Sequence, residues 1–150
     1  MRIVIQKVSN ANVNADGEFT AEISQGLLVL VAICANDKQQ DIDWLCNKIA
    51  SLRLFADESG NMNRSINDVN GDVLVISQFT LYASIKKGNR PSFIRSARPE
   101  VAKPLYDSFV TCLSNVIDSN VKTGVFGANM KVGLVNDGPV TICIDSKEKE

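Results

Sequence analysis

The sequence of 150 residues contains no histidine. A Ser-His-Asp or Cys-His relay is therefore excluded, and so is a metal site that depends on imidazole ligands. Any general base has to be a carboxylate, a lysine with a shifted pKa, or a group on the substrate. An enzyme with this sequence must therefore catalyse an undemanding reaction or receive help from its substrate.

Long hydrophobic segments and cysteine motifs are absent as well. The longest apolar run, residues 26–35, is too short to span a bilayer, and the N-terminus lacks the succession of basic, apolar and small residues of a signal peptide. The cysteines lie at wide spacings in apolar surroundings without a CxxC pair: Cys34, Cys46, Cys112 and Cys143. We expect a cytoplasmic protein that does not associate with membranes, with buried, reduced thiols and with neither a metal nor another cofactor.

The net charge is small, at −1, which argues against a protein that coats nucleic acid through a global positive field. The charge is uneven, however, because residues 84–98 contain no acid. The basic residues of this segment are Lys86, Lys87, Arg90, Arg95 and Arg98. From the charges alone two explanations remain open: the segment is a solvated loop that aids solubility, or it binds a phosphate backbone.

The apolar pattern predicts one α+β domain over residues 1–145, followed by a charged tail, residues 146–150, that we expect to be frayed. The expected strands occupy residues 2–8, 12–24 with a hairpin turn at Asp16-Gly17, 26–35, 72–78, 130–135 and 140–144. The continuous apolar run 26–35 is typical of a central strand buried on both faces. We expect the sheet to be curled, antiparallel-rich and barrel-like, with two main helices covering it.

Apolar residues at helical spacing predict these two helices. The first is expected to run from a cap at Asn36 or Asp37 to about residue 55, and the second over residues 99–120. The expected apolar face of the second comprises Leu105, Phe109, Cys112 and Val116, with Leu113 beside them. Pro104 fits less well, because a proline in a helix interior removes one backbone hydrogen bond. A kink, or a helix that begins near Lys103, would accommodate it.

Two segments place polar, hydroxyl-bearing residues at the end of an apolar run: SQFTL at residues 77–81 and NDGPVT at residues 136–141. A polar end on a buried strand is typical of a functional site. Gly138 tolerates backbone angles that other residues avoid, and a cis peptide is cheap only before proline, so this backbone can form a shaped surface. Structural explanations also remain open, because Asp137-Gly138 is a common hairpin turn and the first segment can simply end a strand.

Together with Gln6-Lys7-Val8, Arg90-Pro91-Ser92-Phe93 and Phe126-Gly127-Ala128, these segments closely resemble the D-aminoacyl-tRNA deacylases, the D-tyrosyl-tRNA deacylase family. The resemblance extends from Met1 to about Ile144. It implies an enzyme that hydrolyses the ester bond of D-aminoacyl-tRNA and releases a free D-amino acid and tRNA. It also implies activity on glycine mischarged on alanine tRNA. Finally, it implies a homodimer in which the Gly-Pro motif of each protomer reaches into the pocket of its partner.

The resemblance also implies roles for individual residues. Gly138 and Pro139, joined by a cis peptide, are implied to face the α-amino group of the substrate and to reject L-residues by steric clash. Lys7 stands where the family commonly has an arginine that fixes this loop, so we expect looser chiral discrimination. The implied catalytic residues are Ser77, Gln78, Phe79 and Thr80, with Met130 or Phe79 near the terminal adenosine. The basic residues of segment 84–98 are implied to contact the acceptor end of the tRNA.

Thr80 is the candidate nucleophile, and main-chain N–H groups near Gln78 and Phe79 are expected to stabilise the developing oxyanion. A threonine hydroxyl needs a base to activate it, and the chain has no histidine. We therefore favour a reaction in which the 2′-hydroxyl of the terminal ribose assists the attack of water on the ester. Two other functions remain open: a non-catalytic tRNA-binding or editing-accessory module, and a hydrolase of another small ester or amide.

Overall fold

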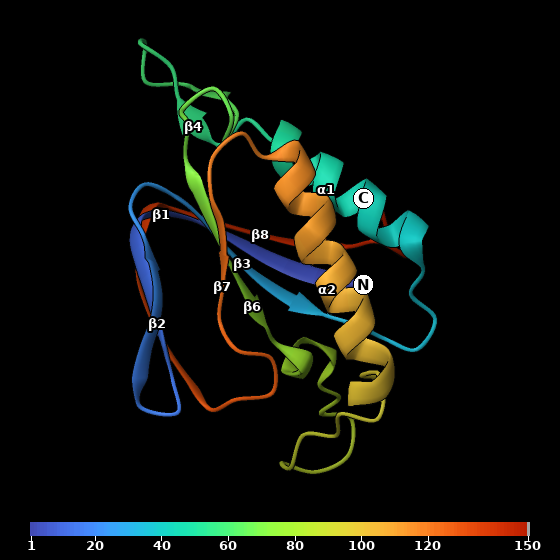
Figure 1. Ribbon diagram of the computed structural model, residues 1–150. Coiled ribbons are helices and arrows are strands. Elements are labelled where there is room, and N and C mark those ends of the chain that lie inside the picture. Colours follow the sequence, from blue (N-terminus) through green and yellow to red (C-terminus); the bar gives the residue numbers. More distant parts are fainter. Residues whose placement is uncertain (150) are drawn as a thin grey trace.

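A mixed β-sheet forms the body of the protein, and two helices pack side by side against it (Figure 1). The computed structural model describes residues 1–149. The strands of the main sheet are β1 Arg2–Ala15, β2 Glu18–Ile23, β3 Gly26–Ala32, β6 Asp72–Ser77, β7 Val121–Thr123 and β8 Met130–Asp145. The helices are α1 Gln39–Ser51 and α2 Pro99–Val116, and a short 3-10 helix, η1 Phe79–Tyr82, follows β6.

The order of the strands makes the sheet curl into a nearly closed barrel. Strand β1 pairs antiparallel with β8 along one edge, whereas along its other edge it pairs first with β3 and then with β2. Strands β3, β6 and β7 are parallel neighbours. On the far side, Lys122 of β7 donates a hydrogen bond to the carbonyl oxygen of Glu22 in β2, at 2.9 Å. The predicted α+β fold with a curled, antiparallel-rich sheet under two helices is therefore confirmed.

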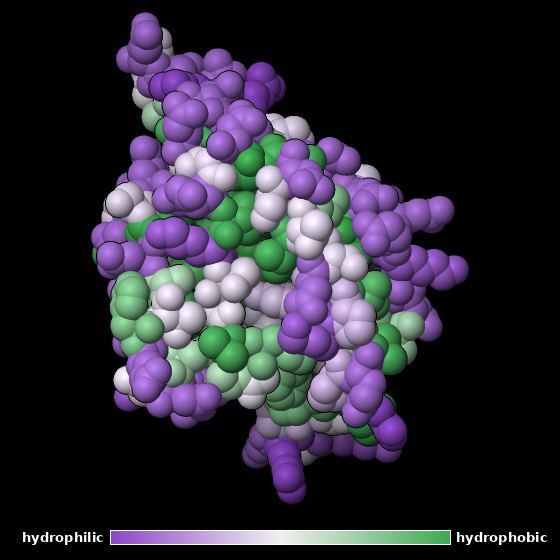
Figure 2. All heavy atoms as spheres, in the orientation of Figure 1, coloured by the Kyte–Doolittle hydropathy of each residue, from purple (hydrophilic) through white to green (hydrophobic). Residues whose placement is uncertain are grey.

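A smaller hairpin extends from the body of the molecule. It consists of β4 Phe55–Ala56 and β5 Met62–Arg64. Its tip projects beyond the helices, and hydrophilic side chains cover this end of the molecule (Figures 1 and 2). Within residues 1–149, neither helix combines the length and the apolar character that are needed to cross a bilayer.

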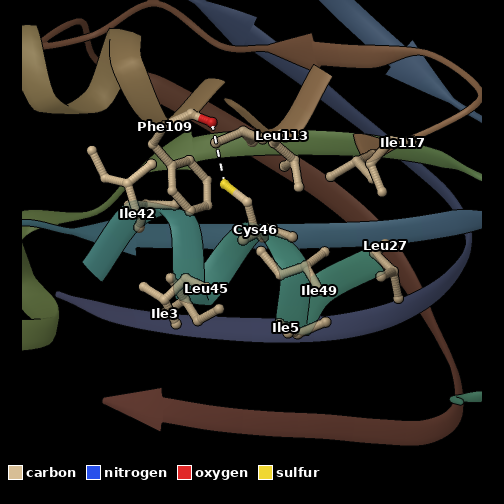
Figure 3. Packing of buried hydrophobic residues seen from close by; sticks show 14 of the residues in the cluster. Ile3, Ile5, Leu27, Ile42, Leu45, Cys46, Ile49, Phe109, Leu113 and Ile117 are labelled. Carbon is tan, nitrogen blue, oxygen red and sulfur yellow. Dashed lines mark hydrogen bonds between the residues drawn. The ribbon is translucent and has the colours of Figure 1, made fainter. Parts of the chain in front are cut away.

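Two hydrophobic cores lie on opposite faces of the sheet. The larger core joins both helices to the sheet: Ile42, Leu45 and Ile49 of α1 meet Phe109 and Leu113 of α2 above the apolar side chains of β1 and β3 (Figure 3). The smaller core fills the inside of the curl and consists of Val8, Ala11, Val13, Ala21, Ile23, Leu28, Leu74 and Ile76. Strand β3 contributes to both cores, so the prediction of a central strand buried on both faces is confirmed.

The helix boundaries differ from the predicted ones. Helix α1 begins after Lys38 rather than after Asn36 or Asp37, because the carboxylate of Asp37 accepts a hydrogen bond from the Cys34 N–H at 2.8 Å and does not cap the helix. Helix α2 begins at Pro99 and contains Pro104, so a start near Lys103 is wrong. Its buried face comprises Ala102, Tyr106, Phe109 and Leu113, whereas the predicted Leu105, Cys112 and Val116 are only partly buried.

Strands β1 and β8 are longer than their local sequence predicts, whereas β3 ends at Ala32 rather than at residue 35. Strand β1 runs without a break through the polar residues Ser9 and Asn10, because β8 pairs with it along nearly its whole length. Strand β8 likewise continues through the NDGPVT segment, which the sequence assigned to a connection between two strands. Strands β5 and β7 were not predicted. The predicted turn at Asp16-Gly17 is confirmed.

The predictions of a frayed C-terminal tail and of buried cysteines are partly wrong. Ser146 is buried and donates a hydrogen bond to Asp41 Oδ1 at 2.7 Å, while Lys147 Nζ donates to Asp41 Oδ2 at 2.6 Å. These two residues are therefore not frayed, and Glu150 lies outside the described residues. Cys46 alone is fully buried, Cys34 and Cys112 are half-buried, and Cys143 is exposed because it lies on β8 at the edge of the sheet.

Asp41 makes the stability of the protein sensitive to acid. Burial raises the pKa of its carboxyl group, but hydrogen bonds from Lys147, Ser146 and the Lys38 N–H outweigh burial and lower the pKa from 3.8 to about 2. A group with a lowered pKa stabilises the folded state above its unfolded pKa, and this contribution is lost as the pH falls toward the folded value. We expect Asp41→Asn to lower the free energy of unfolding by roughly 2 kcal/mol at pH 7 and by almost nothing at pH 2.

Urea denaturation at a series of pH values measures this difference. Asp107→Asn is the matched control, because Asp107 also pairs with a lysine but is exposed, and exposed pairs contribute only about 0–1 kcal/mol. A deficit of Asp41→Asn that stays constant from pH 7 to pH 2 would contradict the assignment.

Candidate active site

A cavity of about 740 Å³ opens where the parallel strands β3 and β6 reach their carboxyl ends. Val31 and Ala32 of β3 and Ile76 and Ser77 of β6 form its floor. The remaining walls come from the start of η1, from the segment that precedes α2, from the first turns of α2, and from residues 126–132. The carboxyl ends of parallel strands are a common place for ligand binding, because the chain leaves the sheet there and loops gather.

Two aromatic pairs line the cavity. Phe79 and Phe93 meet edge to face with ring centroids 5.1 Å apart, and Tyr106 and Phe126 lie 5.4 Å apart. The hydroxyl of Tyr106 donates a hydrogen bond to the carbonyl oxygen of Val75 at 3.2 Å, and burial raises the pKa of this tyrosine, so it stays neutral. Apolar walls with few polar groups are suited to a flat, partly apolar ligand such as a nucleoside.

The SQFTL segment brings its first three residues, Ser77, Gln78 and Phe79, to the cavity. The Gln78 N–H donates a hydrogen bond to the Val31 carbonyl at 2.7 Å, so this amide is already used and is not the expected oxyanion donor. The Phe79 N–H opens the 3-10 helix, where the first amides have no partner within the helix. On the other side of the same residue, Ser96 Oγ donates to the Phe79 carbonyl at 2.7 Å. The main chain of Phe79 is therefore held at the cavity, and its N–H has no partner within the 3-10 helix.

Thr80 lies outside the cavity lining. Its hydroxyl accepts a hydrogen bond from the side-chain amide of Gln78, and an amide cannot remove a proton. Among the described residues that line the cavity, Arg98 alone is charged, and the lining contains neither a carboxylate nor a lysine. The cavity therefore provides no general base, and Thr80 has no group that activates it. Phe79 is 57% exposed, which excludes the alternative that it belongs to the core.

The NDGPVT segment forms a bulge in β8. Gln6 of β1 pairs with Thr141 and Val8 pairs with Asn136, so Lys7 alone stands opposite residues 137–140. The Gly138-Pro139 peptide is cis, and Gly138 has a φ of +134°. A Cβ atom at Gly138 would lie 2.8 Å from Val140 Cγ2 and 3.1 Å from the Val140 nitrogen. Glycine is therefore required here by both its backbone angle and its surroundings.

Polar side chains hold this bulge at its base. Asn136 Oδ1 accepts a hydrogen bond from the Val140 N–H at 3.1 Å, and Asn136 Nδ2 donates to Thr141 Oγ1 at 2.9 Å. Lys7 Nζ lies 3.4 Å from Asp137 Oδ2, and the lysine side chain is only 13% exposed. The polar residues that drew attention in the sequence thus fix the shape of the bulge, and Lys7 contacts it directly.

The bulge and the cavity are far apart within one chain. On β8 the cavity lining includes Met130 and Val132, and Gly138 lies six residues beyond Val132, a separation along the strand of roughly 20 Å at about 3.3 Å per residue. Gly138 and Pro139 are both exposed. Neither Lys7 nor any residue of the NDGPVT segment lines the cavity, so the two motifs belong to separate places in a single protomer.

The basic residues are divided between three environments. Arg98 lines the cavity, and the guanidinium of Arg95 lies 5.6 Å from the ring centre of Tyr82. The other three, Lys86, Lys87 and Arg90, are exposed on a loop between Ser84 and Ser92, which pair through two backbone hydrogen bonds of 2.8 and 2.9 Å. Only residues 84–92 of the acid-free segment form a closed loop, and the part that follows, residues 93–98, contributes to the cavity lining.

Sequence reasoning assigned no role to Ser96 and Tyr106, two polar residues of the cavity, and it quoted Phe126 only as part of the resemblance. Ser96 and Phe126 lie in connections whose path depends on distant packing, and Ser96 carries no local signal. Tyr106 lies on the buried face of α2, one residue away from the predicted apolar stripe, so a corrected helix face would have found it.

A family model described as D-Tyr-tRNA(Tyr) deacylase matches residues 4–145. The chain belongs to this deacylase family. A D-aminoacyl-tRNA deacylase of Bacteroides thetaiotaomicron is 57% identical over 150 residues, and one of Flavobacterium johnsoniae is 55% identical, each match covering 100% of both chains. The family inferred from the sequence motifs is therefore confirmed. Deacylases are hydrolases, so the expectation of an enzyme is confirmed as well.

Solved structures similar to this deacylase agree on the fold. The structure of a c-Myc DNA unwinding element binding protein superimposes with a TM-score of 0.91 at 39% identity, covering 97% of this chain and 98% of that one. A probable eukaryotic D-amino acid tRNA deacylase superimposes with a TM-score of 0.81 at 16% identity, covering 95% of this chain and 97% of that one. At such low identity the second likeness shows the fold alone.

Proposed function

We propose that the protein hydrolyses the ester bond between a D-amino acid and the 3′ end of tRNA, and that it releases the free D-amino acid and tRNA. The observation that carries the proposal is the combination of a fixed Phe79 N–H with a cavity that lacks a general base. This combination suits a reaction in which the protein positions the ester and the substrate supplies the hydroxyl group that assists. Membership of the deacylase family supports the same substrate.

The proposed reaction has one covalent centre, the ester carbonyl carbon. Water attacks this carbon while the 2′-hydroxyl of the terminal ribose relays its proton toward the leaving 3′-oxygen, and the C–O bond of the ester breaks. The Phe79 N–H stabilises the negative charge that develops on the carbonyl oxygen. Phe79, Phe93 and Met130 provide the apolar surface for the terminal adenosine. Ser77 and Gln78 shape the floor of the site, and Thr80 supports Gln78 rather than reacting.

Chiral selection is assigned to the Gly138-Pro139 bulge. Its main chain faces the α-carbon of the substrate, where a D-residue directs its side chain outward and an L-residue drives its Cβ into the bulge. Such a site disregards the identity of the side chain, so it accepts many D-amino acids. Glycine has no Cβ and passes too, which extends the proposed activity to glycyl groups mischarged on alanine tRNA.

The bulge has to act on a second copy of the chain. It is exposed and lies roughly 20 Å along β8 from Val132, the nearest residue of its own cavity on that strand, so the bulge of a partner has to reach the substrate. A symmetric homodimer, in which each bulge enters the other cavity, satisfies both sites at once. Light scattering tests this assembly, and a fully active monomer would contradict it.

Replacing Lys7 tests how the bulge is held. A lysine contacts Asp137 as a single point charge, whereas arginine offers two parallel donors to a carboxylate. We expect Lys7→Arg to raise the ratio of D- to L-aminoacyl-tRNA hydrolysis by about two- to tenfold, because a firmer bulge rejects L-residues more strictly. Lys131→Arg, an exposed substitution elsewhere on β8, is the control. Identical ratios in wild type and Lys7→Arg would refute the idea.

A comparison of matched D- and L-aminoacyl-tRNA tests the proposed function as a whole. We expect release of the D-amino acid only, in a cytoplasmic ionic environment and without added cofactor. A non-catalytic tRNA-binding module would bind both substrates and cleave neither. A hydrolase of other small esters would show turnover that is insensitive to salt, whereas turnover of tRNA weakens steeply as salt is added.

A further inference from the structure

The mouth of the cavity carries an isoleucine that is almost fully exposed. Ile94 lines the cavity and is 93% exposed, next to the Phe79–Phe93 pair. Single exposed apolar side chains are common on protein surfaces and usually require no explanation. Ile94 differs from them in its position, because it continues the apolar wall of the cavity outward into solvent.

Positive charge surrounds this apolar mouth. Arg95 follows Ile94 in the chain, Arg98 lines the cavity, and the loop of residues 85–91 carries three further cations. Within residues 1–149, none of these five cations forms an ion pair with an acid. Hydrophilic side chains project at the lower end of the molecule, where the loop before α2 lies, and hydrophobic surface lies between them and the centre of the view (Figures 1 and 2).

A surface that combines unpaired positive charge with exposed apolar side chains is suited to binding a single strand of nucleic acid. Phosphates are attracted to the cations, while the flat faces of unpaired bases pack on apolar side chains. A double-stranded stem offers phosphates but hides its base faces, so it leaves Ile94 without a partner. In the proposed dimer the partner enters this cavity through its bulge, and a direct contact between two copies of the cationic patch is disfavoured because it brings like charges together.

We propose that the side chain of Ile94 binds the base of the unpaired nucleotide that precedes the terminal adenosine of the tRNA. This inference rests on the proposed function, in which the terminal adenosine and its aminoacyl group fill the cavity. The RNA strand then leaves through the mouth, its next base packs on Ile94, and its phosphates run toward Arg95 and the loop of residues 85–91. This contact with Ile94 lets the enzyme distinguish the end of a tRNA from a free aminoacyl nucleoside.

Two substrates of different length test the proposal. One is D-aminoacyl-tRNA, and the other is adenosine that carries the same D-aminoacyl ester on its 3′-oxygen and has no preceding nucleotide. We expect Ile94→Ser to lower kcat/KM on the tRNA about five- to tenfold, mainly through KM, since a side chain of this size contributes binding on that order. On the adenosine ester we expect a change of less than about twofold.

Ile85→Ser is the matched control. Ile85 is 74% exposed and lies on the same basic loop, but it does not line the cavity. We expect its ratio of tRNA to adenosine-ester hydrolysis to equal that of wild type. Because both isoleucines are exposed, neither substitution should change the thermal stability measured by circular dichroism.

Each of the following outcomes would contradict the proposed contact between Ile94 and the preceding nucleotide. An equal loss on both substrates places Ile94 in contact with the terminal adenosine, and no loss on either removes it from binding. A change from dimer to monomer in Ile94→Ser, measured by light scattering, shows that a second copy covers the residue. Failure of wild type to cleave either substrate is a different result, because it refutes the proposed deacylase function itself.

Discussion

A tRNA that ends in 2′-deoxyadenosine is expected to be hydrolysed about 10²- to 10³-fold more slowly than normal D-aminoacyl-tRNA, with the loss in kcat. The cavity contains no histidine, carboxylate or lysine that could move a proton, so the 2′-hydroxyl of the ribose is the nearest group that can. General acid–base assistance typically contributes about 10²- to 10⁴-fold, and this sets the size of the effect. Single-turnover measurements separate the chemical step from binding.

Thr80→Ala provides the complementary variant. Thr80 lies outside the cavity lining and accepts a hydrogen bond from an amide, so its removal should leave kcat within about fivefold of wild type. Complete loss of turnover in Thr80→Ala, with folding and tRNA binding intact, would show that the threonine is the nucleophile. The deoxy substrate should then be cleaved normally by wild type.

Gly138→Ala is expected to reduce kcat/KM on D-aminoacyl-tRNA by at least about 10²-fold, because small displacements of a positioning element have effects of this size. The new Cβ would meet Val140 Cγ2 at 2.8 Å, and the φ of +134° is one that alanine rarely adopts. The backbone of the bulge therefore has to move, and its fit against the α-carbon of the substrate is lost. Steady-state kinetics and thermal denaturation by circular dichroism measure activity and folding separately.

Gly60→Ala is the matched control for this substitution. Gly60 also has a positive φ, +83°, but a Cβ there meets nothing within 4 Å, and the residue lies on the projecting β4–β5 hairpin. It should therefore carry a comparable backbone penalty while activity stays within about twofold of wild type. Equal losses in both variants would attribute the effect to general destabilisation rather than to the bulge.

Local sequence signals predicted the elements whose structure is set locally. The continuous apolar run of β3 and the Asp16-Gly17 turn are where the pattern indicated. Features that depend on distant partners were not predictable in this way. Strand β1 stays extended through Ser9 and Asn10 because β8, more than a hundred residues away in the chain, pairs with it. Helix α2 accepts Pro104 within its length, although local propensity favours a later start.

The candidate site shows the same division. The SQFTL and NDGPVT segments stood out because polar residues end apolar runs, yet the reason differs between the two. Gln78 and Phe79 line a cavity, whereas Asn136 and Thr141 close the base of a bulge. Thr80 was assigned to the site through the family resemblance, and it lies outside the cavity lining although its neighbour Phe79 belongs to it. The distance between bulge and cavity depends on the length of β8, which the sequence divided into two strands.

Mixing two inactive variants tests most directly whether the bulge of one protomer completes the cavity of another. Phe79→Ala removes a cavity wall and keeps the bulge, and Gly138→Ala does the reverse. Each alone should be nearly inactive on D-aminoacyl-tRNA. After refolding together in equal amounts, half of the dimers are mixed and each contains one intact site, so about a quarter of wild-type activity should return. A mixture that contains mixed dimers by mass spectrometry and stays as inactive as its parents would contradict completion between protomers.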